Sequence, residues 1–177
     1  MESRRKRKRS QIAKWVCYAL LMLLCTVLQT LPGLFRLGEA KPLWLLPLAL
    51  AVAGEVGEFA GGIFGAVCGL MWDYTAGRTA GLLAFELLLL CFLLSAVMQL
   101  YFKTSAANVV LLETVAVLLV LSLDWLFFYY MPGYSGAVER YLWFVLPTAA
   151  LTIPVCLVLF GAVRRIHAEF KIDNDVV

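Results

Sequence analysis

Between residues 61 and 81, glycine or aspartate recurs at every fourth position, and this spacing restricts how the chain can fold. In a helix, residues four apart lie on one face, so these positions form a nearly straight stripe that is smooth for three turns and ends in a carboxylate. The stripe consists of Gly61, Gly65, Gly69 and Asp73. Glycine destabilises a helix, and a membrane helix that repeats it usually does so to let another helix approach closely. The stripe predicts a docking face for a partner, although packing within the chain explains Gly65 and Gly69 at least as well.

The pattern changes after Asp73. The next residues read Tyr-Thr-Ala-Gly-Arg, which predicts a turn, and a new helix is expected to begin near Ala80. The remaining glycines of the repeat, Gly77 and Gly81, flank the basic residue Arg78. We expect partner contact to concentrate in this turn, because loops carry binding residues more often than buried small residues do.

A membrane is the expected surrounding of these helices. The chain of 177 residues is 63% hydrophobic and 15% charged, whereas soluble domains are roughly 45–50% apolar. Its length allows about six spanning helices of roughly 20 residues each and leaves no room for a sizeable soluble domain. We therefore predict an all-α, polytopic membrane helix bundle whose transmembrane domain covers residues 12–163.

The N-terminus carries a dense positive charge. A basic run at residues 4–9 precedes the apolar stretch from Ile12 to Phe35, an arrangement that holds an N-terminus in the cytoplasm. Nucleic-acid binding and a cleaved signal peptide are the alternatives, but the apolar stretch exceeds the roughly 7–15 residues of a signal core and lacks an Ala-x-Ala site. We predict cytoplasmic tails at residues 1–11 and 164–177, with anionic membrane lipid as an added contact of the basic run and no nucleic-acid partner.

Six apolar segments are expected to form the bundle. They cover residues 12–35, 42–53, 60–73, 80–102, 106–130 and 139–163. The second and third are short and are separated by a tight turn, so both can be incomplete spans. An even number of spans keeps most of the lysines and arginines on the cytoplasmic side, as the positive-inside rule requires.

Four acidic residues lie in or beside these segments, where an ionised carboxylate needs a partner. They are Asp73, Glu86, Glu113 and Asp124. Glu113 and Asp124 share a helix face but lie about 16 Å apart along the axis, a separation that excludes a catalytic pair. Arg78 can pair with Asp73 or Glu86, and a structural ion pair at the outer rim is favoured over a transport pathway.

The sequence has no positive signal for an enzyme, a metal site or a cofactor. It lacks the zinc-protease, phosphate-loop and nucleophile-elbow motifs. The five cysteines lie singly in apolar stretches and are expected to be small packing residues. The one histidine, His167, is expected to be a solvated residue beside the membrane.

The central stretch resembles the MreD family of bacterial rod shape-determining membrane proteins. The resemblance rests on the four-residue glycine spacing, on Asp73 within it, and on Leu70 and Leu82, each of which follows a glycine of the repeat. Chain length, about six spans and a short basic tail also agree with the family. Two features depart from it: Trp72 stands where an aliphatic residue is usual, and the N-terminal basic run is longer than expected.

The resemblance implies a non-enzymatic scaffold of the cell elongation machinery in the bacterial cell membrane. Members of the family associate with MreC and, with it, MreB filaments, RodA and a class B penicillin-binding protein, which build lateral peptidoglycan. The resemblance also implies a fold similar to the substrate-binding component of energy-coupling-factor vitamin transporters. Carried onto this chain, it makes interaction-site candidates of Gly61, Gly65, Gly69, Asp73, Gly77, Arg78 and Gly81.

A substrate-binding membrane subunit of a vitamin transporter is the alternative function. It requires a polar pocket near Glu86 or Glu113 that would hold a small-molecule ligand. Ala49 and Ala53 are the only hint of the small-residue pattern with which such subunits meet their coupling protein.

Overall fold

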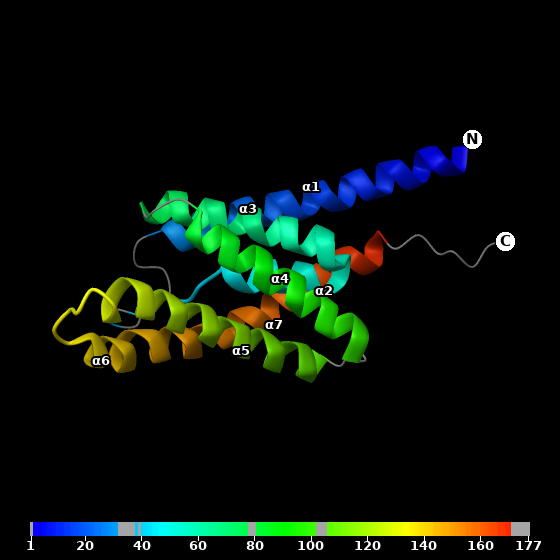
Figure 1. Ribbon diagram of the computed structural model, residues 1–177. Coiled ribbons are helices and arrows are strands. Elements are labelled where there is room, and N and C mark those ends of the chain that lie inside the picture. The colour runs from blue at the N-terminus through cyan, green and yellow to red at the C-terminus, as the bar shows by residue number, and fades with distance from the viewer. Residues whose placement is uncertain (1, 32–37, 39, 78–80, 102–105, 171–177) are drawn as a thin grey trace.

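The computed structural model describes residues 2–31, 38, 40–77, 81–101 and 106–170, which fold as an all-α bundle (Figure 1). The helices are α1 (Glu2–Thr30), α2 (Leu45–Val56), α3 (Glu58–Ala76), α4 (Leu82–Tyr101), α5 (Ala106–Trp125), α6 (Ala137–Arg140) and α7 (Leu146–Glu169). Two π-helical turns, η1 (Leu126–Tyr130) and η2 (Tyr141–Val145), continue α5 and lead into α7. The all-α bundle predicted from the sequence is confirmed.

Among the described residues, three helical segments are long and apolar enough to cross a membrane. They are Lys8–Thr30, Val109–Tyr130 and Ala137–Glu169. Two further apolar helical segments, Leu45–Val56 and Leu82–Met98, are shorter than the roughly 20 residues that a perpendicular span requires. The three long segments make this a membrane protein. Whether the shorter helices between them also cross the membrane, which would give about six spans, stays a prediction.

The first and last helices extend into the charged residues beyond the apolar segments from which they were predicted. Helix α1 begins at Glu2, within the basic run, and projects beyond the bundle at that end (Figure 1). Helix α7 continues past the last apolar residues to Glu169. Lysine and arginine are good helix formers, so the charged ends of these segments prolong the helices rather than ending them.

Helix α2 forms the centre of the bundle. It has 12 residues, and every residue from Leu45 to Ala53 is buried. It packs against each of α1, α3, α4, α5 and α7. A helix that is apolar on all sides has no preferred solvent face, so this segment is stable only when other helices enclose it.

Side chains from two other helices satisfy the buried start of α2. The Oε1 atom of Gln29 in α1 accepts hydrogen bonds from the backbone N–H groups of Trp44 and Leu45, at 3.1 and 3.0 Å. The Oγ1 atom of Thr152 in α7 accepts one from the N–H of Leu43, at 3.2 Å. The first N–H groups of a helix have no partner within it, so these contacts supply acceptors that a bilayer lacks.

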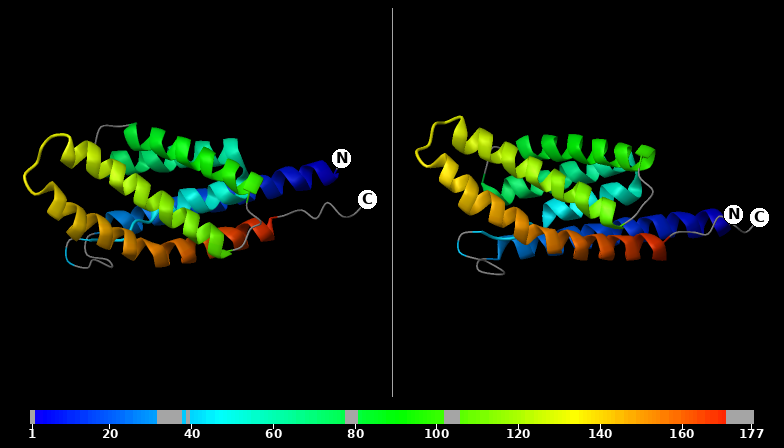
Figure 2. Two further views of the ribbon diagram at one scale, coloured as in Figure 1. Left: turned by 60° about the horizontal axis from the view of Figure 1, so that its bottom comes forward. Right: turned by 90° about the horizontal axis from the view of Figure 1, so that it is seen from below.

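Two antiparallel helix pairs flank α2. Helices α3 and α4 pack closely along each other and against α2. Helices α5 and α7 lie side by side in both views of Figure 2 and are joined through η1, α6 and η2. The tip of this second pair is at the end of the molecule opposite the start of α1 and the end of α7 (Figure 1).

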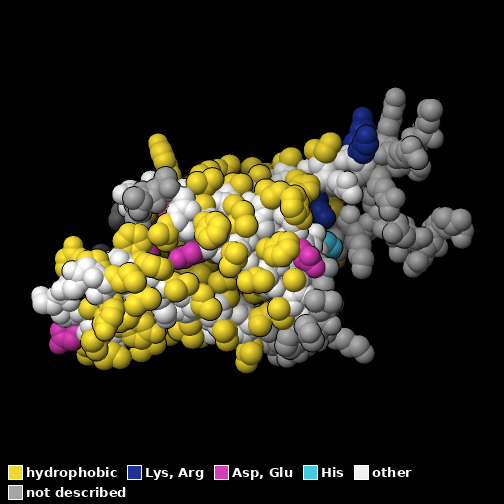
Figure 3. Space-filling model, viewed as in Figure 1, with side chains coloured by type: hydrophobic (Ala, Val, Ile, Leu, Met, Phe, Trp, Pro, Cys, Tyr) yellow, Lys and Arg dark blue, Asp and Glu magenta, His cyan; other side chains and the backbone are white. Residues whose placement is uncertain are grey.

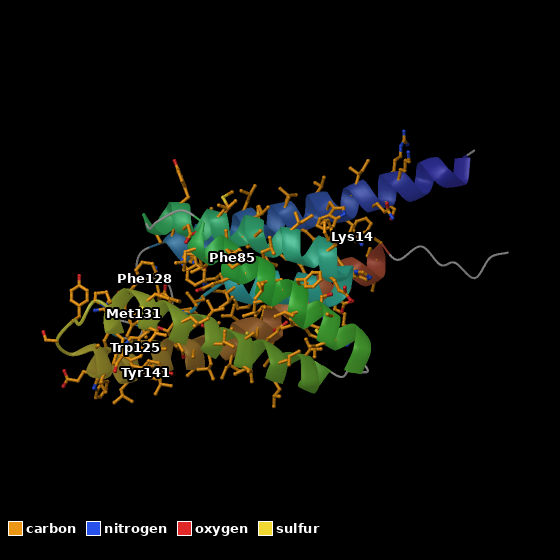
Figure 4. All side chains as sticks on the ribbon, in the orientation of Figure 1. Lys14, Phe85, Trp125, Phe128, Met131 and Tyr141 are labelled. Carbon is orange, nitrogen blue, oxygen red and sulfur yellow. The ribbon has the colours of Figure 1, made fainter. Side chains whose placement is uncertain are left out.

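Apolar side chains cover most of the molecule's visible surface. Figure 3 shows hydrophobic residues over most of that face, while the lysine and arginine side chains seen there lie near the chain termini. Figure 4 places Lys14 toward that end and Trp125, Phe128, Met131 and Tyr141 at the opposite tip. A lipid-facing belt with positive charge at one end and aromatic rings at the other is typical of a membrane bundle.

Candidate functional site

The glycine stripe lies at the contact of α3 with α2 and α4, and all of its members are buried. A methyl group added to Gly61 would lie 2.7 Å from the Cα atom of Ala53 in α2. One added to Gly65 would lie 2.8 Å from the carbonyl oxygen of Leu87 in α4. These separations are shorter than any normal van der Waals contact, so only glycine permits these backbones to approach as they do.

The closest approach is at Gly69. A methyl group there would lie 2.5 Å from the Cα atom of Ala84 and 2.7 Å from its backbone nitrogen, and both atoms belong to the backbone of α4. The structure therefore places the stripe against helices of the same chain. A partner helix could reach these three glycines only by displacing α2 or α4.

Asp73, the acidic end of the stripe, closes the connection from α3 to α4. Its side chain is 2% exposed, and its Oδ2 atom accepts a hydrogen bond from the backbone N–H of Gly81 at 2.8 Å. Gly77 ends α3 in the left-handed conformation, with φ of 63°, which glycine adopts without strain. Gly81 also has a positive φ, 111°. Arg78 and its predicted ion pair with Asp73 or Glu86 lie outside the described residues.

Replacing Asp73 separates the structural role of this carboxylate from its charge. Asp73→Ala removes the acceptor for the Gly81 N–H and is expected to cost about 1–3 kcal/mol of unfolding free energy. Asp73→Asn keeps a carbonyl oxygen at the same position and is expected to retain most of that stability. Thermal unfolding of the purified protein in detergent measures both. Equal loss in the two variants would contradict the hydrogen-bond assignment.

The other acidic residues fall into two groups. Glu86 in α4 is partly buried and lies within electrostatic range of Asp124 in α5 and Asp73 in α3. Three acidic residues far apart in sequence are thus gathered near the α3–α4 connection. Sequence periodicity gave no sign of this grouping, because it depends on where α5 packs. Glu113 stands apart from the three.

Glu113 lies in the interior of the bundle and is fully buried. The Cys156 thiol of α7 interacts with its carboxyl group, but neither carboxyl oxygen makes a hydrogen bond of normal geometry within the described part of the chain. No charged residue among those described accompanies it. Glu113 and Asp124 therefore have different environments, although they share a helix face.

Several polar residues that hold the helices together could not be recognised from the sequence. Gln29 and Thr152 cap α2, and neither stands out because each is a single polar residue in an apolar run. His167 is partly buried, and its Nδ1 atom lies 3.5 Å from the Tyr18 hydroxyl, which joins α7 to α1. His167, which was expected to be solvated, is therefore partly covered by α1.

Within the described residues there is no group of three or more histidines, cysteines and acidic residues that could hold a metal ion. All five cysteines are free thiols. The hollows at the surface that the described residues form include the following three. A groove of about 340 Å³ lies between α1 and α3 and is lined by Trp15, Ala19, Met22, Ala60, Ile63, Phe64 and Val67. A second, of about 230 Å³, lies beside Pro154 of α7, and a third, of about 690 Å³, is at the tip of the α5–α7 pair.

These features define a helical membrane protein built around close helix packing. Residues 9–166 match the family described as rod shape-determining protein MreD, so the chain belongs to that family. Its role is therefore in the determination of rod shape. Comparisons with curated proteins and with solved structures gave no match. The expected likeness to the substrate-binding component of vitamin transporters stays a prediction.

Proposed function

We propose that this protein is a non-enzymatic scaffold in the cell membrane that binds an MreC-like protein and helps to organise lateral peptidoglycan synthesis. Through that protein it would act with MreB filaments, RodA and a class B penicillin-binding protein. The family match over residues 9–166 carries the proposal. The apolar surface of the bundle supports it, because a scaffold needs faces on which the spanning helices of partners can pack.

The proposed topology is multi-pass with both ends in the cytoplasm. The start of α1 and the end of α7 lie at the same end of the molecule (Figure 1), as an even number of crossings requires. Lys14 lies toward that end, and exposed aromatic residues such as Tyr134 and Trp143 lie at the tip of the α5–α7 pair. The positive-inside rule then assigns the termini to the cytoplasm.

The outer face of α3 is the proposed docking surface for a partner's spanning helix. Phe59, Ile63, Val67, Leu70 and Tyr74 follow one another along α3 on the side away from the glycines, and each is at least 40% exposed. Ile63 and Val67 of this face line the groove between α1 and α3. The face ends at the Asp73–Gly81 connection, so a helix lying along α3 would also meet the turn predicted to contact partners.

Co-purification with the MreC-like protein tests this function and surface. Val67→Trp fills the α1–α3 groove and is expected to cost about 1–3 kcal/mol of binding, which lowers the affinity about ten- to hundredfold. Leu157→Trp is the matched control, because Leu157 is 54% exposed on α7 and lines none of the three hollows. Asp73→Asn removes the negative charge of the turn but keeps an acceptor for the Gly81 N–H, so it tests whether that charge contributes to partner binding.

Two results would count against this function and surface. Wild-type protein that failed to co-purify with an MreC-like protein from the same cells would refute the function. Equal binding by Val67→Trp and Leu157→Trp would refute the surface alone. The transporter alternative has less support, since neither Glu86 nor Glu113 lines any of the three hollows described above.

A further inference from the structure

The tip of the α5–α7 pair contains an open cup with a mixed polar and aromatic lining. Its volume is about 690 Å³, and its walls include Tyr129, Tyr134, Ser135, Glu139, Arg140 and Phe144. Tyr129 comes from η1 and Phe144 from η2, so the two arms of the pair form opposite walls. The other two hollows are apolar, which makes this cup the distinctive one of the three.

A single guanidinium group is held in position inside the cup. The Cζ atom of Arg140 lies 4.5 Å from the centre of the Tyr129 ring and 5.3 Å from that of the Phe144 ring. Contacts of this kind use the charge of the guanidinium group and do not require its N–H groups as hydrogen-bond donors. Within the described part of the chain, no hydrogen bond or ion pair engages these N–H groups. The cup therefore presents up to five donors and one positive charge in a restricted orientation.

Contacts between the two arms hold the walls of the cup together. The Trp125 indole N–H donates to the backbone oxygen of Ala137 at 2.8 Å, and the Ser122 and Tyr141 hydroxyls are 3.0 Å apart. Trp125 and Tyr141 also pack edge to face, and Figure 4 shows them close together. Each arm carries a π-helical turn at this level, a rare feature that is concentrated at functional sites.

The position of the cup indicates where its ligand comes from. The spanning segments Val109–Tyr130 and Ala137–Glu169 meet at the cup, so it lies where the apolar part of the pair ends. Trp143 on the rim is 79% exposed, and Leu142 and Leu146 next to it are 53% and 42% exposed. Large amphipathic rings beside exposed aliphatic side chains are typical of the boundary between lipid tails and headgroups.

We propose that the cup binds the phosphate headgroup of an anionic phospholipid through Arg140. Arginine binds phosphate oxygens in a bidentate manner, and the Tyr134 and Ser135 hydroxyls can donate to the remaining oxygens. The acyl chains would lie along Leu142 and Leu146. Glu139 on the rim repels the anion, so the affinity of the site depends on the balance of these two neighbouring charges. Under the proposed topology this lipid belongs to the outer leaflet, although the chemistry of the site is independent of the leaflet.

Quenching of Trp143 fluorescence by brominated lipid tests the proposal on the full chain in vesicles. The vesicles are made of phosphatidylcholine with a minor fraction of phosphatidylglycerol, and either lipid carries the bromine. Comparison with a Trp143→Phe version of each protein isolates the signal of Trp143. We expect brominated phosphatidylglycerol to quench Trp143 more than an equal fraction of brominated phosphatidylcholine does. Arg140→Gln should weaken the apparent affinity for phosphatidylglycerol at least about tenfold.

Two further variants are tested beside Arg140→Gln, and neither is expected to weaken binding. Glu139→Gln removes the repulsive charge and should strengthen phosphatidylglycerol binding. Arg164→Gln is the matched control, because Arg164 lies 6.0 Å from the Phe160 ring nearer the other end of α7, and its loss should leave the quenching of Trp143 unchanged. Excess inorganic phosphate in the buffer should also have no effect, which distinguishes a lipid headgroup from a soluble phosphate.

Each opposite result overturns the proposal. Equal quenching of wild-type Trp143 by the two lipids would remove the preference for an anion, and an unchanged preference in Arg140→Gln would remove the role of the guanidinium group. Displacement by inorganic phosphate would make a soluble anion the ligand. If Arg140→Gln reduced co-purification of a protein partner and left lipid quenching intact, the cup would be a protein-binding surface instead.

Discussion

Gly69→Ala is expected to destabilise the protein severely, because the new methyl group would lie 2.5 Å from the Cα atom of Ala84 and 2.7 Å from its backbone nitrogen. Neither atom can turn away as the end of a flexible side chain can. Helices α3 and α4 would have to separate, and overpacking of this kind costs about 1–3 kcal/mol and occasionally more. Gly69→Leu should prevent the native contact altogether. The midpoint of thermal unfolding in detergent and the amount of protein in the membrane report both effects.

Gly161→Ala is the matched control for this prediction. Gly161 lies within α7, and a methyl group there would meet nothing within 4 Å. Alanine is the better helix former by about 0.5–1 kcal/mol, so this variant should be as stable as the wild type or slightly more so. If the Gly69 and Gly161 variants unfolded at the same temperature, the close packing of α3 on α4 would be wrong.

Gln29→Ala is expected to have the second large effect. The substitution removes the acceptor for the backbone N–H groups of Trp44 and Leu45, which lie at the buried start of α2. A buried donor left without a partner costs about 1–3 kcal/mol, and the Leu45 N–H, which is buried, loses its acceptor. We therefore expect about 1–3 kcal/mol of lost unfolding free energy, together with faster proteolysis of the membrane-embedded protein.

The control for Gln29→Ala is Gln11→Ala. Gln11 also lies in α1, but its side chain is exposed. The two substitutions have the same chemistry and the same effect on helix propensity, so their difference isolates the cap. Comparable stability of the two variants would show that the start of α2 draws its acceptors from elsewhere.

The main elements of the fold could be predicted because apolar segments of helical length are unambiguous in a chain this hydrophobic. The break between α3 and α4 was also evident, since the Tyr-Thr-Ala-Gly-Arg run ends the apolar pattern after Asp73. The sequence could not tell which surface the glycine stripe would meet. Close approach requires small residues on both helices, and Ala53 and Ala84 are two of many alanines in the chain.

Polar contacts between distant helices were beyond prediction for a different reason. Gln29 and Thr152 are single polar residues whose acceptor atoms matter only once α2 is placed between α1 and α7. The grouping of Glu86 with Asp124 likewise depends on how α4 and α5 pack. A periodic pattern predicts which face of a helix is special, whereas the identity of its neighbour follows from the tertiary arrangement.

The shared cap on α2 has a consequence for biosynthesis. Leu43 donates to Thr152, which the ribosome adds 109 residues later. Until the final helix has left the ribosome, the Leu43 amide lacks that acceptor, at a cost of several kcal/mol if it is exposed to hydrocarbon. The nascent chain must therefore keep its second helix in a temporary environment, such as the insertion machinery, until translation ends. A chain truncated before the last helix would never supply the Thr152 acceptor, and we expect its poorly packed second helix to make it a substrate of membrane quality-control proteases.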